Sequence, residues 1–366
     1  MHRRTLWTRS ATTLRRYVHS QQTISKAVQE IRELLSHTFT LPATSSSVSK
    51  SACNDAKALV ANALLPRLPF SNDVFLHGER KLTELEAAQL RVSVEQRAKG
   101  EPLAYIIGKK EFWSMDFRVT KDTLIPRSDS EVLIETLVEQ FHPQTPLQIL
   151  DIGTGTGCLL LSALSEFLRA TGVGIDISLG ALEAAKENAR FHNLDGRSNF
   201  VLRDLQTLPG LQNDDEAMYQ RFDVILCNPP YIPRRELHLV EPDVLEYEPH
   251  LALFPDGGPT RKDTGADPDG LRMYQLLYES VDNLFKNHAE RVKGFGEGVL
   301  GHHTTKNCLL MEIGSEDQAR LVQKLFTRKV MTRNGGDMME KESLLQFERF
   351  LYDASEKYRG LCFKTH

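Results

Sequence analysis

The chain has few cysteines and no motif that would pair them. The five cysteines among its 366 residues are scattered and odd in number, and no two form a C-x-x-C pair. This pattern excludes a disulfide scaffold and a zinc ribbon, and it favours a reducing compartment. No group of histidines, cysteines and acidic residues has the spacing of metal ligands, and His302-His303 read as solvent-facing, so we expect no metal site.

Hydropathy and charge exclude two further classes of protein. No window of about 18 consecutive apolar residues occurs, which excludes a transmembrane helix. The formal charge of −4 excludes a generally basic nucleic-acid-binding protein, although not a local basic patch. Apolar residues form 40% of the chain, enough for a sizeable core. The length predicts about two or three folding units. We expect no membrane contact and no direct nucleic-acid binding.

The first 29 residues contain arginines, serines and threonines, and the first acidic residue is Glu30. Such a start, without an apolar core, is typical of a mitochondrial transit peptide and not of a secretory signal; a disordered basic tail is the alternative. We expect residues 1–20 to be the transit peptide and the mitochondrial matrix to be the destination. Cleavage there leaves a net charge of −9, because five arginines and no acidic residue are removed.

Apolar residues recur at three-to-four spacing through residues 22–107, which predicts a small helical domain. Its last helix is expected over Thr83–Ala98, with Thr83 and Glu86 as a capping box, and the serine-rich segment 41–52 is expected to be a loop. Residues 108–130 form a linker with a short hairpin, predicted from the apolar residues Phe112, Trp113, Phe117 and Val119.

From residue 131 to 366 we expect a single α/β domain. Its predicted strands are 147–152, 173–177, 200–204, 222–227 and 308–313. The predicted helices between and after them are Cys158–Arg169, Leu179–His192, Leu271–Phe285 and Asp317–Phe326. This alternation predicts a parallel, doubly wound sheet with ligands at the carboxyl ends of its strands. Segments 255–270 and 289–306 are interpreted as flexible surface insertions.

A glycine-rich turn follows the first strand of this domain. It has the spacing G-x-G-x-G and comprises Gly153, Thr154, Gly155, Thr156 and Gly157. The spacing differs from the G-x-G-x-x-G of dinucleotide folds, and a purely structural turn is the alternative.

Acidic residues end the next two predicted strands. Asp176 is placed to accept hydrogen bonds from two ribose hydroxyls, and Asp204 from an adenine amino group, although Asp204 could instead cap a helix. Together with the glycine-rich turn they indicate a nucleoside without phosphates, for which S-adenosylmethionine is the candidate.

The fourth strand runs directly into Asn228-Pro229-Pro230-Tyr231. Two prolines cannot continue a ladder, so the chain leaves the sheet here with Asn228 held in place; a strand-ending turn is the plain alternative. The Asn228 side-chain oxygen and the Pro229 carbonyl can each accept one N–H of a planar NH2 group. This orients the nitrogen toward an activated methyl carbon, and the Tyr231 ring can pack on the substrate and the methyl donor.

These residues resemble the HemK/PrmC family of protein-(glutamine-N5) methyltransferases. The resemblance covers most of residues 55–315. It is carried by the Arg97…Pro-Leu-Ala-Tyr-Ile-x-Gly108 segment, Glu111-Phe-Trp113, Leu124-Ile-Pro-Arg127, the glycine-rich turn, NPPYI, Tyr247-Glu-Pro249, Asp269-Gly-Leu271 and Glu312-Ile-Gly314. Many members have Ile-Pro-Arg-Pro-Glu-Thr-Glu where this chain has IPRSDSE, and some have an aromatic residue at Leu205. The part past residue 316 matches poorly.

The resemblance implies a seven-stranded Rossmann-like class I methyltransferase sheet with a small N-terminal helical domain. It implies that the glycine-rich turn, Asp176, Asp204, Leu205 and Asn228 bind S-adenosylmethionine. Asn228, Pro229, Pro230 and Tyr231 would hold the glutamine of a Gly-Gly-Gln loop in a peptide-chain release factor. Phe112 and Arg127 would lie near the cofactor or substrate mouth. With the transit-like start, the partner is expected to be a mitochondrial release factor, and the enzyme a monomer.

Two other classes of function remain open on the residues. An adenine-N6 methyltransferase acting on DNA or RNA would use the same Asn-Pro-Pro-Tyr sequence. The net charge and the lack of a Lys/Arg run beyond the leader disfavour it. A non-catalytic binding or assembly factor would tolerate replacement of Asn228.

Overall fold

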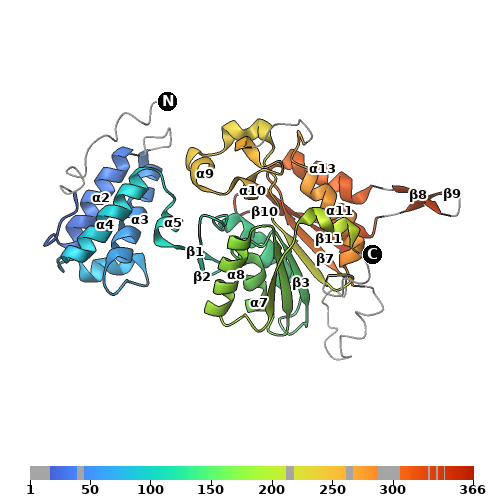
Figure 1. Cartoon of the computed structure of the whole chain (residues 1–366), viewed down its shortest axis with the longest axis horizontal. Coiled ribbons are helices and arrows are strands. Elements are labelled where there is room, and N and C mark those ends of the chain that lie inside the picture. The colour runs from blue at the N-terminus through green and yellow to red at the C-terminus, as the bar shows by residue number, and fades with distance from the viewer. Residues whose placement is uncertain are drawn as a thin grey trace. The chain divides into compact units, whose positions relative to one another are not determined.

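The computed structural model describes residues 17–38, 45–211, 218–260, 267–286, 306–328, 330–334, 337–341 and 343–366. The chain divides into two compact units, residues 1–108 and 109–366. Figure 1 shows a helical first unit and a second unit built on a central sheet. The expected transit peptide lies almost wholly outside the described residues, as do residues 289–305 with His302-His303.

The first unit is an assembly of helices around one apolar core. Buried side chains from its helices, among them Ile31, Leu59, Leu90 and Val94, form a single cluster. Its elements are α2 (Ile24–Thr38), α3 (Ser45–Ala63), η1 (Ser71–His77), α4 (Glu84–Ala98) and α5 (Leu103–Ile107). The small helical domain is therefore confirmed.

One local prediction in this unit is confirmed and one is wrong. Thr83 accepts from Glu86 N and the Glu86 side chain accepts from Thr83 N, which is the predicted capping box. The loop predicted over 41–52 is wrong from residue 45 onward, because α3 begins at Ser45. Serine has only a modestly unfavourable helix propensity, and burial of Ala52, Ala56, Leu59 and Val60 on α3 outweighs it.

Glu86 also makes the stability of the first unit depend on pH. Burial alone would raise the pKa of its carboxyl, but hydrogen bonds from Arg80, Thr83 N and Leu65 N outweigh burial and lower the pKa from 4.5 to about 2. Because the pKa is lower in the folded state, the ionised Glu86 carboxylate stabilises the fold above pH 4.5. This contribution to the free energy of unfolding is lost as pH falls from 4.5 to about 2.

We therefore predict that Glu86→Gln destabilises the first unit at neutral pH and that its deficit against the wild type shrinks below pH 4.5. Urea unfolding followed by far-ultraviolet circular dichroism at several pH values measures this difference. A deficit that stays constant down to pH 2 would contradict the prediction.

The second unit opens with the predicted hairpin, shifted toward the N-terminus. Strand β1 (Lys109–Phe112) pairs antiparallel with β2 (Met115–Arg118), and the two-residue turn is Trp113-Ser114. Both turn residues have positive φ (51° and 55°), the backbone that joins tightly twisted strands. Trp113 is therefore a turn residue, and its indole N–H donates to Glu166 (2.7 Å).

A seven-stranded sheet forms the centre of the second unit, with strand order β10-β11-β7-β6-β3-β4-β5. The five strands from β7 to β5 run parallel, whereas β11 pairs antiparallel with β7 and with β10. Their bounds are β3 Gln148–Ile152, β4 Thr171–Asp176, β5 Ser198–Leu202, β6 Val224–Cys227, β7 Cys308–Glu312, β10 Leu345–Tyr352 and β11 Tyr358–Thr365.

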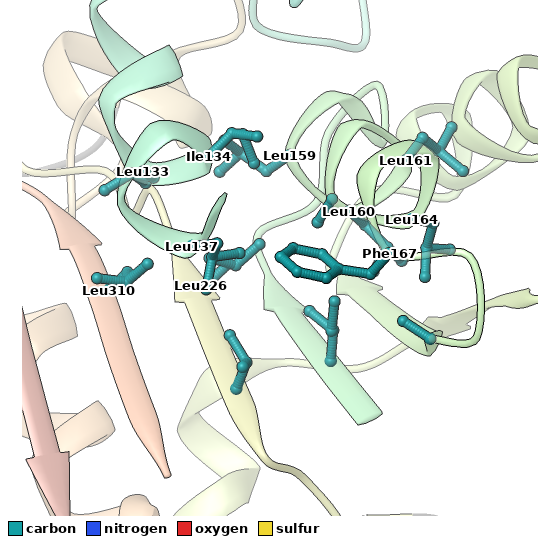
Figure 2. Packing of buried hydrophobic residues seen from close by; sticks show 14 of the residues in the cluster. Leu133, Ile134, Leu137, Leu159, Leu160, Leu161, Leu164, Phe167, Leu226 and Leu310 are labelled. Atoms are coloured by element: carbon teal, nitrogen blue, oxygen red, sulfur yellow. The ribbon is translucent and has the colours of Figure 1, made fainter. Parts of the chain in front are cut away.

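Helices cover both faces of this sheet. Successive side chains of each buried strand point to opposite faces, and the apolar side chains on each face pack against helices. Leu226 of β6 packs with Leu137, Leu160 and Phe167 on one face, as Figure 2 shows, while Ile225 joins the other face. The first face carries α6 (Glu131–Gln140), α7 (Cys158–Glu166) and α8 (Leu179–Phe191); the second carries α11 (Arg272–Leu284) and α13 (Glu316–Thr327).

Shorter elements complete the described part of this unit. They are η2 (Ser128–Ser130), η3 (Leu205–Gly210), η4 (Arg234–Leu239), α9 (Pro242–Tyr247), α10 (His250–Leu253), η5 (Gly258–Thr260) and the hairpin β8 (Val330–Asn334) with β9 (Asp337–Lys341). In the segment 255–270, η5 occupies 258–260 and residues 261–266 lie outside the description. None of the described helices is long and apolar enough to cross a membrane.

The predicted strands and helices of the α/β domain are confirmed to within three residues at each end. The seven-stranded Rossmann-like sheet is also confirmed, and its five predicted strands run parallel as expected. Strands β10 and β11, which were not predicted, add an antiparallel pair at one edge. Strands β10 and β11 are joined by a short turn at 353–357, and such a hairpin connection forces antiparallel pairing.

Candidate active site

A cavity of about 450 Å³ lies at the carboxyl ends of β3, β4, β5 and β6. Most of the residues singled out from the sequence line it. They are Arg127, Gly153, Thr154, Gly155, Thr156, Asp176, Asp204, Leu205, Asn228, Pro229 and Pro230. The topology explains this convergence, since all parallel strands end at the same edge and the strand order reverses at β3.

The glycine-rich turn forms one wall of the cavity. Gly153, Gly155 and Gly157 all have positive φ, a conformation that side chains disfavour, so glycine is needed for the chain to turn here. Gly157 does not line the cavity; a Cβ there would lie 3.1 Å from Leu161 and 3.3 Å from Ala185. Its role is therefore close packing of α7, while Gly153 and Gly155 bring backbone to the ligand.

The two acidic residues at the strand ends differ in surroundings. Asp176 ends β4, and its two oxygens accept from Gly155 N and Ser178 N (2.9 Å each). Burial raises its pKa. Each oxygen keeps a further lone pair for a ligand in the cavity. Asp204 caps η3 by accepting from Gln206 N (2.9 Å), so the capping alternative is confirmed. It also lines the cavity, and its contact with an adenine amino group stays a prediction.

Asn228 follows β6 directly, and a hydrogen bond to Ser130 holds its side chain. Its side-chain Nδ2 donates to Ser130 Oγ (3.4 Å), the last residue of η2. No other hydrogen bond of this side chain occurs among the described residues. The side-chain oxygen therefore remains available to a donor in the cavity, and Pro229, whose carbonyl is the expected second acceptor, lines the same cavity. This is the acceptor pair that a planar NH2 group requires.

Tyr231 takes a different position from the one expected. It lines a neighbouring depression with Ile232, Gly314 and Gln318, and is not among the residues of the main cavity. Its hydroxyl donates to Glu312 Oε1 (3.1 Å), and burial raises its pKa. Packing of its ring on the methyl donor is not supported by this position, while a contact with the substrate stays a prediction.

The backbone around Tyr231 is held tightly. A Cβ on Gly270 would lie 2.3 Å from Tyr231 O, and Gln318 Nε2 donates to the same carbonyl (3.0 Å). Gln318 also donates to Asp269 O (3.1 Å). The Asp-Gly motif at 269–270 therefore gives room to the loop that follows Asn228. The role of Gln318 was not predictable from the sequence, because the carbonyls that accept from its Nε2 belong to residues 48 to 87 positions away.

Arg127 lies in the cavity wall with its guanidinium occupied. It donates to Glu248 Oε1 (2.5 Å) and to Ile125 O (2.9 Å), and the buried Glu248 also accepts from Ile125 N (3.1 Å). This contact joins the Ile-Pro-Arg segment to the Tyr-Glu-Pro segment 121 residues away. The two motifs thus build one part of the wall together. Direct contact of Arg127 with a substrate stays a prediction. The expectation for Phe112 is wrong, because its side chain is buried in the core and does not line the cavity.

Asp151 lies beneath the glycine-rich turn and is 1% exposed. Burial raises its pKa from 3.8 to about 7, although the Thr154 hydroxyl donates to it (2.6 Å), and the nearby Asp176 raises the pKa further. A positive charge placed in the cavity favours the ionised carboxylate. We therefore expect that a cationic ligand in the cavity releases a proton from Asp151 near pH 7.

Comparison with known proteins places the chain in a family. Residues 18–108 match the PrmC N-terminal domain and residues 144–258 match a methyltransferase domain. A release factor glutamine methyltransferase of Bradyrhizobium diazoefficiens is 36% identical over 276 residues, covering 75% of this chain and 79% of the relative. The same-named protein of Cereibacter sphaeroides is 37% identical over 286 residues, covering 77% and 85%. The chain belongs to the release factor glutamine methyltransferase family.

The cofactor of this methyltransferase is S-adenosylmethionine, and the cavity fits it. Asp176 in the wall keeps lone pairs that can accept from ribose hydroxyls, and Gly153 and Gly155 bring backbone to the ligand without a side chain in the way. Gly153, Gly155 and Asp176 would hold the nucleoside portion. When bound, the cofactor supplies an electrophilic methyl carbon. The described residues contain no cluster of three or more side chains that would hold a metal ion.

We predict that cofactor affinity rises between about pH 6 and pH 8, because the cationic cofactor favours ionised Asp151, whose pKa is about 7 when the cavity is free. Titration calorimetry at pH 7 in two buffers of different ionisation enthalpy should show release of protons. Asp151→Asn should lose most of this release. An equal release in the variant would contradict the assignment to Asp151.

Proposed function

We propose that this methyltransferase transfers the methyl group of S-adenosylmethionine to the side-chain amide nitrogen of a glutamine in a peptide-chain release factor. One observation carries the proposal. Asn228 and Pro229 lie together in the cavity wall at the end of β6, with Asn228 Nδ2 engaged by Ser130. The names of the relatives, release factor glutamine methyltransferases, support the same substrate.

The residues suit the chemistry of an amide nitrogen. Such a nitrogen is a poor nucleophile, because its lone pair is delocalised into the carbonyl. Two acceptors, Asn228 Oδ1 and Pro229 O, would hold its two N–H groups and orient the nitrogen toward the methyl carbon. They would also stabilise the positive charge that develops on the nitrogen as the new N–C bond forms and the S–C bond breaks. The proton leaves the nitrogen afterwards.

We further propose that the glutamine belongs to a Gly-Gly-Gln loop. A loop with two glycines before the glutamine presents a side chain without neighbouring bulk, so the glutamine can extend into the cavity toward Asn228. The test incubates the enzyme with a release factor and methyl-labelled cofactor, followed by mass spectrometry of the tip loop. A release factor that stays unlabelled, or a label on another residue, contradicts the proposal.

We propose that the release factor is mitochondrial and that the enzyme acts in the matrix as a monomer. Support comes from the composition of residues 1–29, which carry arginines and no acidic residue. Fusion of residues 1–30 to a fluorescent reporter tests the location, and a reporter that remains in the cytosol rejects it. Light scattering of the purified protein gives its molecular mass and so tests the prediction of a monomer.

Adenine-N6 methylation of DNA or RNA is the alternative, because an exocyclic amino group would fit the same acceptors. The net charge of −4 disfavours a polyanionic substrate. Nucleic acid incubated with enzyme and labelled cofactor distinguishes the two, since methyladenine is the product of the alternative alone.

A further inference from the structure

Three polar side chains form a chain of hydrogen bonds that ends at Asn228, and one of them, Ser130, also lines the cavity. Glu312, at the end of β7, is 4% exposed. It accepts from the hydroxyl of Ser130 through Oε2 and from the hydroxyl of Tyr231 through Oε1 (3.1 Å). Ser130 is 3% exposed and in turn accepts from Asn228 Nδ2 (3.4 Å).

The polarity of this chain follows from counting protons. An ionised carboxylate can only accept, and the Ser130 hydroxyl has a single proton, which it donates to Glu312. Toward Asn228, Ser130 therefore offers only a lone pair. Only the amino group of the Asn228 amide can satisfy that lone pair, since the flipped amide would set two oxygens against each other.

We infer that Ser130 and Glu312 are positioning residues that fix the flip of the Asn228 amide, so that its oxygen and not its nitrogen faces the substrate. The inference rests on the proposed function, which needs an acceptor at that atom. With the amide reversed, Asn228 would present N–H groups to the N–H groups of the substrate. The buried carboxylate of Glu312, which reaches Asn228 through Ser130, thus decides whether the site can hold an NH2 group.

Ionic groups and hydrogen-bond donors surround Glu312 and act on its protonation in opposite directions. Arg359 of β11 pairs with Asp129 of η2 (2.8 Å), which fixes the turn that carries Ser130. Burial is the largest influence on Glu312 and raises its pKa; the hydrogen bonds from Ser130 and Tyr231 and the charge of Arg359 oppose this rise, whereas the charge of Asp129 adds to it. Tyr231 and Ser130 donate to the carboxylate, and Tyr274 donates to the Glu312 backbone carbonyl (2.7 Å). A protonated Glu312 could donate to the Ser130 oxygen. Ser130 could then donate its own proton to Asn228 Oδ1, which reverses the direction of both hydrogen bonds.

Two variants test the inference, Ser130→Ala and Glu312→Met. The first removes the acceptor for Asn228 Nδ2. The second leaves the Ser130 hydroxyl free to donate to Asn228 Oδ1, and replacing a buried charge by an apolar side chain of similar volume need not destabilise the fold. Each should lower kcat on the release factor on the order of 10- to 100-fold while cofactor affinity stays unchanged. Ser130→Thr keeps the hydroxyl and should restore activity.

Matched controls separate positioning from general damage. Ser162→Ala removes a buried hydroxyl of α7 that has no partner among the described residues. Asp223→Asn alters a buried carboxylate at the opposite end of β6, where it accepts from Lys286 and Gln148 N (2.8 Å each). Both should keep the wild-type kcat. The wild type should also lose kcat at low pH, and Glu312→Met should lack that limb of the profile.

The outcomes distinguish this inference from the proposed function. If the wild type methylates the release factor and both variants retain its kcat, the inference is wrong and the function stands. If the wild type leaves the release factor unlabelled, the proposed function fails. The inference is then tested on the Asn228 side-chain amide in the protein without substrate. The side-chain NH2 signals of Asn228 in ¹⁵N-labelled protein, assigned with Asn228→Asp, should then shift in Ser130→Ala. Unshifted signals would overturn the inference.

Discussion

Asn228→Ala should lower kcat for methyl transfer on the order of 10²–10³-fold, while the protein stays folded and still binds cofactor. The reason is that the substitution removes the acceptor that would hold the substrate nitrogen and share its developing charge. The residue is half-buried in the cavity wall, and within the described part of the chain its side chain makes one hydrogen bond, to Ser130, so its loss changes little packing. Steady-state rates with labelled cofactor, together with a cofactor titration, measure the effect.

Asn307→Ala is the matched control for this experiment. Asn307 is a buried asparagine immediately before β7, and its side chain donates to Lys286 O (2.9 Å), far from the cavity edge of the sheet. It should lose stability but keep kcat. If Asn228→Ala retained wild-type kcat, neither the amide clamp nor the function proposed from it would survive.

Asp176→Ala should weaken binding of S-adenosylmethionine by roughly 1–3 kcal/mol, or about 5- to 150-fold in Kd. Its carboxylate holds Gly155 N and Ser178 N, and its remaining lone pairs face the cavity. The substitution therefore removes ligand hydrogen bonds and also loosens the glycine-rich turn. Calorimetry gives the affinity, and the rise in Tm on adding cofactor, which depends on Kd, should shrink in parallel.

Asp223→Asn again serves as the control, because it alters a buried carboxylate at the end of β6 opposite the cavity. Cofactor affinity in this variant should match the wild type. An Asp176→Ala protein with undiminished affinity would show that the carboxylate does not hold the ribose, and the interpretation of the β4 end would have to be abandoned.

The local features of the fold were predictable wherever neighbouring residues decide them. Periodicity located the buried strands and helices of the α/β domain, because a strand or helix must bury one face within its own span. The capping box of Thr83 and Glu86 needs residues only three apart. The serine-rich start of α3 could not be judged in this way, since its helix depends on packing against the rest of the first unit.

The sequence by itself determined that the glycine-rich turn, Asp176, Asp204 and Asn228 share one edge of a sheet, because each lies at or just beyond the carboxyl end of a strand in a doubly wound unit. Only the tertiary structure decided that Gly157 packs a helix, that Tyr231 faces the neighbouring depression, and that Ser130 and Glu312 stand behind Asn228. Ser130 and Glu312 lie 182 positions apart. Contacts across such distances depend on which strands become neighbours and which way each side chain turns, and no local spacing in the chain specifies either.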